Sequence, residues 1–376
     1  MEERIYLDHA AAMPVNPGVA RFCRQFPGGF AGNPSTIYQE GLAAQATVAA
    51  AREKVAALIG ARDPASIVFT SGATESNNIA IRGTALRNRK MGERIVTSAI
   101  EHISVLNPAK DLQKNGFTFT EVPVDHFGVI DLDTLTAAVT PETVVTSVHY
   151  ANNEIGTIEP IREVAEIVHE REGFLHVDAT DAAGRIPIDV ERDGIDLLTL
   201  SSNQLGGPDG VGALYIRPGV RVQPVIVGGG QERGLRPGTE NVFGIACMGE
   251  AARLAGEEMP EERRRLQEIR DLLIAGITDI EEAYLTGHPT ERLPHHASFR
   301  FSRIEGESIQ LAMNMLGIAI ATGSACTSRT LEASHVLLGI GLAHDEAHGS
   351  MVATLGHENS LDEVSRVVSA TRETVK

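Results

Sequence analysis

The sequence predicts an α/β protein in which helices cover both faces of a mainly parallel sheet. Short apolar segments alternate with helical stretches from residue 66 to residue 216, which is the pattern of parallel strands joined by crossover helices. The 376 residues are 42% hydrophobic and 22% charged, which is a globular composition. A chain of this length suits two domains or one large α/β unit.

The first elements along the chain are a helix, a strand and a second helix. Residues 41–59 are rich in alanine, and Gly60 follows them, so they are predicted to form a helix that ends at this glycine. Residues 66–70 have the apolar character of a short buried strand. A glycine-containing turn at 71–74 then leads into a helix from residue 75 to about residue 88.

Six further apolar segments complete a predicted seven-stranded sheet. They are residues 94–97, 117–122, 144–149, 174–178, 197–201 and 212–216. A long charged helical stretch follows at 245–280, and we expect Pro260 to interrupt it. We therefore predict a large α/β domain at 16–258 and a smaller α+β domain formed by residues 1–15 and 259–376.

Composition and charge limit the class of partner and the compartment. The chain has 50 acidic and 33 basic residues, a net charge of −17, which argues against nucleic acid or an anionic membrane as a main partner. It has no apolar run long enough to span a membrane, and no signal peptide is expected before residues 5–7. Three widely separated cysteines predict neither a disulfide framework nor a structural zinc site. We expect a cytoplasmic protein.

Lysines are unusually few, and their positions exclude some mechanisms. The five lysines are Lys54, Lys90, Lys110, Lys114 and Lys376, and none lies between residues 115 and 375. A reaction that needs a lysine side chain from this second part of the chain is therefore excluded.

The turn between the first strand and its helix has the features of a phosphate cradle. Gly72 allows close approach of the backbone, and the Thr74 hydroxyl and the first helical N–H groups, from Ala73 onward, can hold an anion. The alternative is an ordinary tight turn between a strand and a helix.

Two polar residues follow predicted strands. Asp178 ends the segment 174–178, where a carboxylate could hold the protonated ring nitrogen of a cofactor such as pyridoxal phosphate, or could simply cap a helix. His102 follows the segment 94–97, where its imidazole could stack on a cofactor ring or move protons, or could be an ordinary loop histidine.

Cys326 lies in a run of small polar residues at 321–328, which predicts an exposed, mobile loop. A cysteine there is a candidate nucleophile, persulfide carrier or metal ligand, and the alternative is an incidental thiol. Cys23 and Cys247 lie in more apolar or helical surroundings, and we expect them to be inert.

Together these motifs resemble the NifS/IscS-type cysteine desulfurases of the class V aminotransferase superfamily, whose members have the fold type I architecture and use pyridoxal 5′-phosphate (PLP). The resemblance covers nearly the whole chain, and the matching motifs occur in order. They are YLDHAA at residue 6, GNPS at 32, FTSGATESNN at 69, EH at 101, ANNEIG at 151, HVDAT at 176, GGGQERG at 228 and GSACTS at 323.

The resemblance assigns roles to individual residues. Gly72, Ala73, Thr74 and Ser201 would hold the cofactor phosphate, with Thr239 supplied from the other subunit of a homodimer. His102 would stack on the ring, and Asn153 and Asp178 would contact the ring substituents and the ring nitrogen. Cys326 would accept sulfur as a persulfide and pass it to an IscU-type iron–sulfur scaffold protein, or would bind the metal of a shared [2Fe–2S] cluster as a ligand.

The sequence departs from the family pattern at five positions. Gln204 replaces the lysine to which the family attaches its cofactor, and Asn203 replaces the histidine before that lysine. Asp181 replaces a glutamine beside the cofactor hydroxyl, and Val352 replaces the arginine that binds the substrate carboxylate. His357 replaces a further arginine that occurs in many members. These departures resemble an archaeal branch of IscS-like proteins that lacks the lysine.

We therefore predict an IscS-like component of iron–sulfur cluster assembly with weak ordinary desulfurase turnover, in which Gln204 and Asn203 still border a non-covalently held PLP. The alternative is an active cysteine desulfurase that converts L-cysteine to L-alanine and a persulfide with non-covalent PLP. A different PLP-dependent enzyme is the third hypothesis, and the sequence supplies no base for it other than His102.

Overall fold

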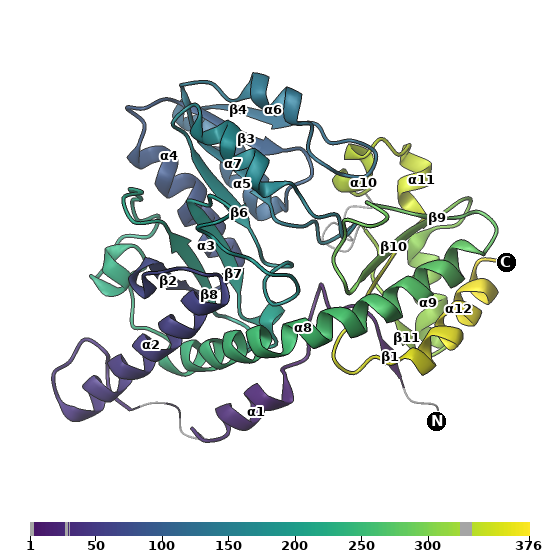
Figure 1. Ribbon diagram of the computed structural model, residues 1–376, viewed down its shortest axis with the longest axis horizontal. Helices are drawn as coiled ribbons and strands as arrows, with labels where there is room; N and C mark the ends of the chain where they lie inside the picture. The colour runs from purple at the N-terminus through teal and green to yellow at the C-terminus, as the bar shows by residue number, and fades with distance from the viewer. Residues whose placement is uncertain (1–3, 27–28, 30, 324–332) are drawn as a thin grey trace.

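The computed structural model describes all residues except 1–3, 27–28, 30 and 324–332. Figure 1 shows a large α/β half and a smaller half beside it, with the long helix α8 running from one to the other. The α-helices are α1 (Pro17–Cys23), α2 (Gln39–Leu58), α3 (Ala73–Asn78), α4 (Thr84–Arg87), α5 (Ile103–Leu112), α6 (Leu132–Ala138), α7 (Ile161–His169), α8 (Val242–Thr278), α9 (Gly306–Met315), α10 (His335–Gly339), α11 (His344–His348) and α12 (Leu361–Thr374).

The central sheet has seven strands in the order β2-β8-β7-β6-β5-β3-β4. Only β8 runs antiparallel to its neighbours, so the predicted mainly parallel sheet is confirmed. The strands are β2 (Ile67–Thr70), β3 (Arg94–Ser98), β4 (Thr118–Val122), β5 (Thr143–His149), β6 (Phe174–Asp178), β7 (Leu197–Ser201) and β8 (Gly212–Ile216). The chain therefore has the predicted α/β class, with every central strand at its expected place.

Helices cover both faces of the central sheet, which explains why its strands read as continuous apolar runs. Helices α3, α4 and α5 pack on one face and α2, α6, α7 and α8 on the other. Alternate residues of β3 show the arrangement, because Ile95 belongs to the buried cluster under α5 and Val96 to the cluster on the opposite face. The carboxyl ends of the parallel strands meet at the edge that faces the smaller half.

Two helices of the large half follow their sequence signals closely. Helix α2 ends before Gly60, whose φ of 68° lies in the left-handed region that favours glycine. The predicted helix after residue 75 begins two residues earlier, at Ala73, and includes a π-helical turn at Ile79–Gly83 between α3 and α4. The turn at 71–74 therefore connects β2 directly to a helical N-terminus.

The smaller half contains a three-stranded antiparallel sheet in the order β12-β10-β9 and a two-stranded parallel pair, β1 with β11. Its strands are β1 (Ile5–Tyr6), β9 (Ala283–Leu285), β10 (His296–Phe301), β11 (Ile318–Ala319) and β12 (Ser350–Thr354). Residues of β1, α8, β10, α9, β12 and α12 share one buried apolar cluster. The N-terminal strand thus packs with elements more than 250 residues away in the chain.

Helix α8 corrects one expectation. It runs unbroken through 37 residues with Pro260 inside it, so the predicted interruption is wrong. Proline removes one N–H donor, which leaves the carbonyl of Gly256 without its usual helical partner. Residues 253–265 contain no fully buried residue, so water can satisfy that carbonyl and the helix continues.

The cysteines correct a second expectation. Cys23 in α1 and Cys247 in α8 form a disulfide, with their Cα atoms 6.1 Å apart, although 224 residues separate them. Cys326 lies outside the described residues. None of the helices in the described part of the chain is long and apolar enough to cross a membrane.

Candidate active site

A cavity of about 350 Å³ lies at the carboxyl ends of β5, β6 and β7, where the two halves meet. This is the position at which open α/β sheets bind ligands. Its described lining residues come from both halves and from the N-terminal segment. They are Asp8, Ala10, Ala11, Ala73, His102, His149, Ala151, Asn153, Glu154, Asp178, Thr180, Asp181, Gln204, Ala321, Thr322, Gly323 and Val352.

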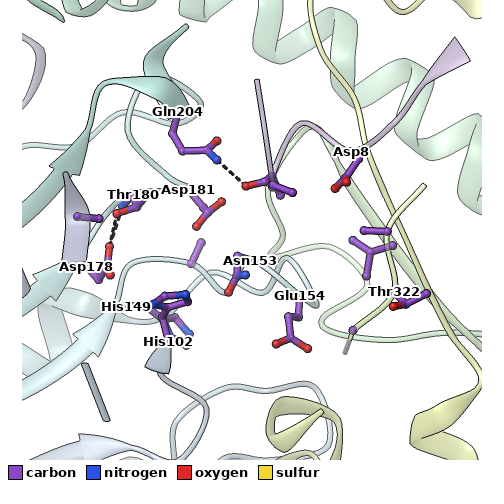
Figure 2. Close-up of a pocket in the computed structure, with 17 residues that line it drawn as sticks. Asp8, His102, His149, Asn153, Glu154, Asp178, Thr180, Asp181, Gln204 and Thr322 are labelled. Atoms are coloured by element: carbon purple, nitrogen blue, oxygen red, sulfur yellow. Dashed lines mark hydrogen bonds between the residues drawn. The ribbon is translucent and has the colours of Figure 1, made fainter. Parts of the chain in front are cut away.

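Asp178 is fixed at the end of β6 by hydrogen bonds to both of its carboxylate oxygens. Asn77 Nδ2 donates to Oδ2 at 2.7 Å, and the Thr180 backbone N–H and hydroxyl donate to Oδ1 at 3.0 and 2.5 Å. Figure 2 shows the Thr180 contact at one end of the cavity. A carboxylate held in this way is a rigid acceptor for a ligand N–H group.

His102 forms the N-cap of α5 and lines the same cavity. Its Nδ1 atom accepts a hydrogen bond from the Ser104 backbone N–H at 3.1 Å. In the neutral ring the proton therefore lies on Nε2. The Ser104 hydroxyl lies 2.7 Å from the same Nδ1 atom, and it also accepts from Asn77, so one network fixes both His102 and Asp178.

A buried ionic cluster centred on His149 forms part of the cavity wall. His149 is paired with Asp178 in the sheet register, and its Nδ1 lies 3.1 Å from Glu101 while its Nε2 lies 3.5 Å from Glu159. Burial by itself lowers the pKa of His149, but the two carboxylates outweigh that effect and raise it to about 10. His149 is therefore a cation at neutral pH, balanced by two carboxyl groups.

Asp181 lines the cavity between Asp178 and Gln204, and its carboxyl group is directed into the open space (Figure 2). Burial first, and the Asp178 carboxylate second, raise the pKa of Asp181 to about 7. Among the described residues, none donates a hydrogen bond to the Asp181 side chain. This carboxyl group therefore exchanges a proton near neutral pH and is available to a ligand.

Gln204 occupies the position at which the family has its lysine. It lies in a short 3₁₀ turn after β7 and is buried, and its Nε2 donates to the Ala10 carbonyl at 2.5 Å. Figure 2 shows this bond between the turn and the N-terminal segment. The cavity is thus closed here by an amide that makes a structural hydrogen bond.

The loop after β5 connects the cavity to the smaller half. Asn153 and Glu154 line the cavity, and the backbone carbonyl of Asn153 accepts a hydrogen bond from His296 Nε2 in β10 at 2.8 Å. Burial lowers the pKa of His296 to about 3, so this ring is neutral and can donate. Gly156, with a φ of 77°, packs so closely on His296 that a Cβ would lie 2.7 Å from the ring.

Glu154 lies at the edge of the cavity beside both described ends of the segment that contains Cys326. Its Oε2 accepts a hydrogen bond from the Ser334 hydroxyl at 2.5 Å, and Gly323 lies against the same carboxyl group. Burial raises the pKa of Glu154 to about 7, against the opposing effect of the Ser334 hydrogen bond.

The structure brings together about half of the site residues expected from the sequence. Ala73, His102, Asn153, Asp178 and Gln204 all line the cavity. The other described residues of the predicted set, Gly72, Thr74, Ser201, Asn203 and Thr239, do not line it. Thr74 and His102 instead border an adjoining hollow on the α5 side, and the Ser201 hydroxyl is held by Asn203 Oδ1 at 2.5 Å. Cys326 lies outside the described residues.

Sequence reasoning missed the residues whose role depends on several segments. Asp8, His149 and Glu154 line the cavity, and none of them was expected to do so. The cluster of His149 with Glu101 and Glu159 spans three separate segments, and no local spacing indicates it. The sequence identifies Asp181 only as a departure from the family pattern.

The chain resembles known proteins over nearly its whole length. The family model described as aminotransferase class V matches residues 5–367. A cysteine desulfurase IscS 1 from Archaeoglobus fulgidus is 49% identical over 363 residues, which cover 96% of this chain and 94% of that protein. A cysteine desulfurase IscS from Clostridium botulinum is 43% identical over 379 residues, covering 100% and 95%.

A solved structure described as a NifS-like protein superposes on this one with a TM-score of 0.92, at 35% identity and with 98% of each chain covered. The relatives come from both an archaeon and a bacterium, so placement in an archaeal branch stays a prediction. Sequence and fold agree over the same residues: the chain belongs to the class V aminotransferase family, among the IscS- and NifS-type cysteine desulfurases.

Proposed function

We propose that this chain acts in iron–sulfur cluster assembly as an IscS-type homodimer that holds PLP without a covalent bond and turns over cysteine weakly. The family implies PLP as cofactor, so the first question is whether the cavity fits it. Asp178 and His102 offer a fixed acceptor and an aromatic ring on one side of the space. Nothing lies within 4 Å of the position that a Cβ on Gly72 would occupy, which leaves room above the turn at 71–74. These residues fit the cofactor.

One observation carries the proposal of weak turnover. The described residues that line the cavity include no lysine and no arginine, and Gln204 is engaged with the Ala10 carbonyl. An amide neither attaches a carbonyl cofactor nor accepts a proton from substrate at neutral pH. Val352, at the position of the family's carboxylate-binding arginine, adds an apolar wall.

The roles of the chain's own residues follow from this arrangement. Bound PLP supplies an electron sink for chemistry at the substrate α-carbon. Asp178 would hold the ring nitrogen, His102 would stack on the ring, Asn153 would contact its substituents, and Thr74 and Ser201 would bind the phosphate. Thr239 is exposed and does not line the cavity of its own chain, which is compatible with a contact to the partner subunit of a homodimer.

Cys326 is the proposed point of contact with an IscU-type scaffold, as persulfide carrier or as ligand of a shared [2Fe–2S] cluster. The support is the GSACTS motif together with the position of the flanking residues. Gly323 donates its backbone N–H to Ser350 Oγ at 2.9 Å, and Ser334 binds Glu154. Gly323, which precedes the segment, and Ser334, two residues after its end, are therefore both held by hydrogen bonds, the latter to a residue of the cavity lining. Thiolate sulfur is a soft ligand that suits iron.

The test is made in two assays on the same preparation. Alanine and sulfide are measured after adding L-cysteine and PLP, and [2Fe–2S] formation is measured spectroscopically on an IscU-type scaffold supplied with iron and sulfide. We expect little alanine, and we expect cluster formation to depend on this protein and to be lost in Cys326→Ser but kept in Ser328→Ala. Unchanged cluster formation in Cys326→Ser would refute the proposal.

The second candidate is an active cysteine desulfurase that uses non-covalent PLP. The retained hydrogen-bond network of Asp178 and His102 favours it, because the residues that would hold the ring are in place. Steady alanine release that disappears in Cys326→Ser would establish this function instead.

A further inference from the structure

The cavity is acidic in a way that the proposed cofactor does not explain. Four carboxyl groups line it, from Asp8, Glu154, Asp178 and Asp181, whereas its described lining contains no lysine or arginine. His149 also lines the cavity as a cation, but Glu101 and Glu159 already oppose its charge with two carboxyl groups. The walls therefore present net negative charge to whatever occupies the space.

Two of the four carboxyl groups are open to a ligand: Asp8, whose Oδ1 is buried without a hydrogen-bond partner, and Asp181, which is the one beside Asp178. Asp178 is satisfied by Asn77 and Thr180, and Glu154 by Ser334. No described side chain or backbone group donates to Asp181, and its carboxyl group points into the cavity between Asp178 and Gln204 (Figure 2). A half-buried acceptor without a protein donor is stabilised by a ligand that brings a donor, and most by a charged one.

We propose that the cavity binds the amine form of the cofactor, pyridoxamine 5′-phosphate, in preference to forms that carry no amine, and that Asp181 makes this selection. The inference rests on the proposed function, in that it takes the cavity to be the cofactor site. In a pocket with a lysine, the protein supplies the amine. Here the ligand supplies it, because the chain has no lysine between residues 115 and 375.

The groups around Asp181 determine how the preference depends on pH. Asp178 and burial raise its pKa to about 7, and His149 and Arg185 partly oppose this. Asp8, Glu154 and His102 complete the ionisable groups of the described lining. An ammonium group stabilises the ionised carboxylate, so the amine form binds more tightly as the pH rises through 7. A ligand without that charge gains nothing from this ionisation, so the preference grows with pH.

The experiment compares three ligands by titration calorimetry on the full chain at pH 6.0 and pH 8.5. They are pyridoxamine 5′-phosphate, PLP and pyridoxine 5′-phosphate, which has a hydroxyl in place of the amine and cannot react with surface lysines. We expect the amine form to bind about 10- to 100-fold more tightly than the hydroxyl form at pH 8.5, the range typical of a charge-assisted hydrogen bond. We expect a smaller ratio at pH 6.0.

Variants assign the effect to one residue. Asp181→Asn should bring the ratio close to one at both pH values, and Asp181→Gln serves as a second variant in case the first is unstable. Asp209→Asn makes the same chemical change at an exposed site outside the cavity and should behave as the unaltered chain. Thermal unfolding shows that each variant is folded before it is titrated.

Three results would overturn the proposal. They are equal affinity for the amine and hydroxyl forms, a preference that persists in both Asp181 variants, and no binding of any of the three ligands. The first two are distinct from failure of the proposed function. Absence of binding would also refute its non-covalent PLP, whereas the dependence of cluster formation on Cys326 is measured separately, without any added cofactor.

Discussion

The sheet side and the small-domain side of the cavity are built from different kinds of residue. The sheet side comprises His102, His149, Asp178 and Asp181, and hydrogen bonds or ion pairs fix the first three. The small-domain side comprises Asp8, Ala321, Thr322, Gly323 and Val352, of which only Asp8 is ionisable. The sheet side offers groups that would hold a ring, whereas the described residues of the small-domain side offer no cation to an amino-acid carboxylate. If the proposed roles hold, separate elements carry ligand binding and turnover, and each can be lost without the other.

The largest effect expected on the sheet side comes from His149→Gln. The substitution leaves Glu101 and Glu159 buried without their cation, which should lower the free energy of unfolding by about 3–5 kcal/mol. The pKa of His149 is about 10 in the folded chain, above the ordinary value of 6.5. Its stabilising contribution is therefore complete below about pH 6.5 and lost as the pH rises to about 10. Urea unfolding across this range measures both effects.

His344→Gln is the control, because His344 is exposed on α11 and should leave the stability unchanged. If His149→Gln and His344→Gln unfold at the same urea concentration, the ionic cluster does not stabilise the sheet side.

The second prediction restores the missing groups. Gln204→Lys together with Val352→Arg should raise alanine release from L-cysteine, in the presence of PLP, by about 100-fold or more. A positioned base contributes about 10²–10⁴-fold, and the arginine restores a two-point contact to the substrate carboxylate. The assay is alanine formation, with each single variant measured beside the pair.

Asp209→Lys adds a lysine outside the cavity and should leave alanine release at the level of the unaltered chain. A folded double variant with no gain in activity would show that the sheet side is itself not competent, and the comparison of the two sides would fail.

The third prediction removes the fixed acceptor of the sheet side. Asp178→Asn replaces a charge-assisted hydrogen bond by a neutral one and should weaken pyridoxine 5′-phosphate binding by about 10- to 100-fold. Titration calorimetry at pH 7 measures the affinity. Equal loss in Asp209→Asn would show that the effect is general charge and not the contact at the end of β6.

The smallest effect is expected at the rim of the cavity, where Glu154 lies. Its pKa of about 7 lies above the ordinary value of 4.5, so the folded chain holds this proton longer than the unfolded chain. Its contribution therefore lowers the free energy of unfolding as the pH rises from about 4.5 to 7. Glu154→Gln should make the decrease measured by urea unfolding shallower, and an unchanged slope would contradict the assignment.

The sequence predicts the sheet well because strands that are buried on both faces are continuous apolar runs. Each strand from β2 to β8 is a short apolar run, and Gly60 marks the end of α2. The predicted interruption at Pro260 was wrong because the cost of a proline is local. Packing at both ends of α8 outweighs that cost, so the helix continues past Pro260.

The site is predicted less completely because its electrostatics come from distant segments. Asp178 ends a strand and His102 follows one, so the local sequence is enough to predict that both lie near the cavity. The cation at His149 depends on Glu101 and Glu159, which lie 48 and 10 residues away along the chain and meet it only in the fold. The disulfide of Cys23 and Cys247 is hidden for the same reason.

Helix α8 has a mechanical consequence for the cavity. It is anchored against α2 at one end and α12 at the other, and the 13 residues from 253 to 265 between them, roughly 20 Å of helix, lie in a span without fully buried side chains. Pro260 removes one backbone hydrogen bond from that span. The helix is thus packed firmly at both ends and is more easily bent near Pro260. A bend at this point of α8 would therefore change the distance between Gln204 on one half and Val352 on the other.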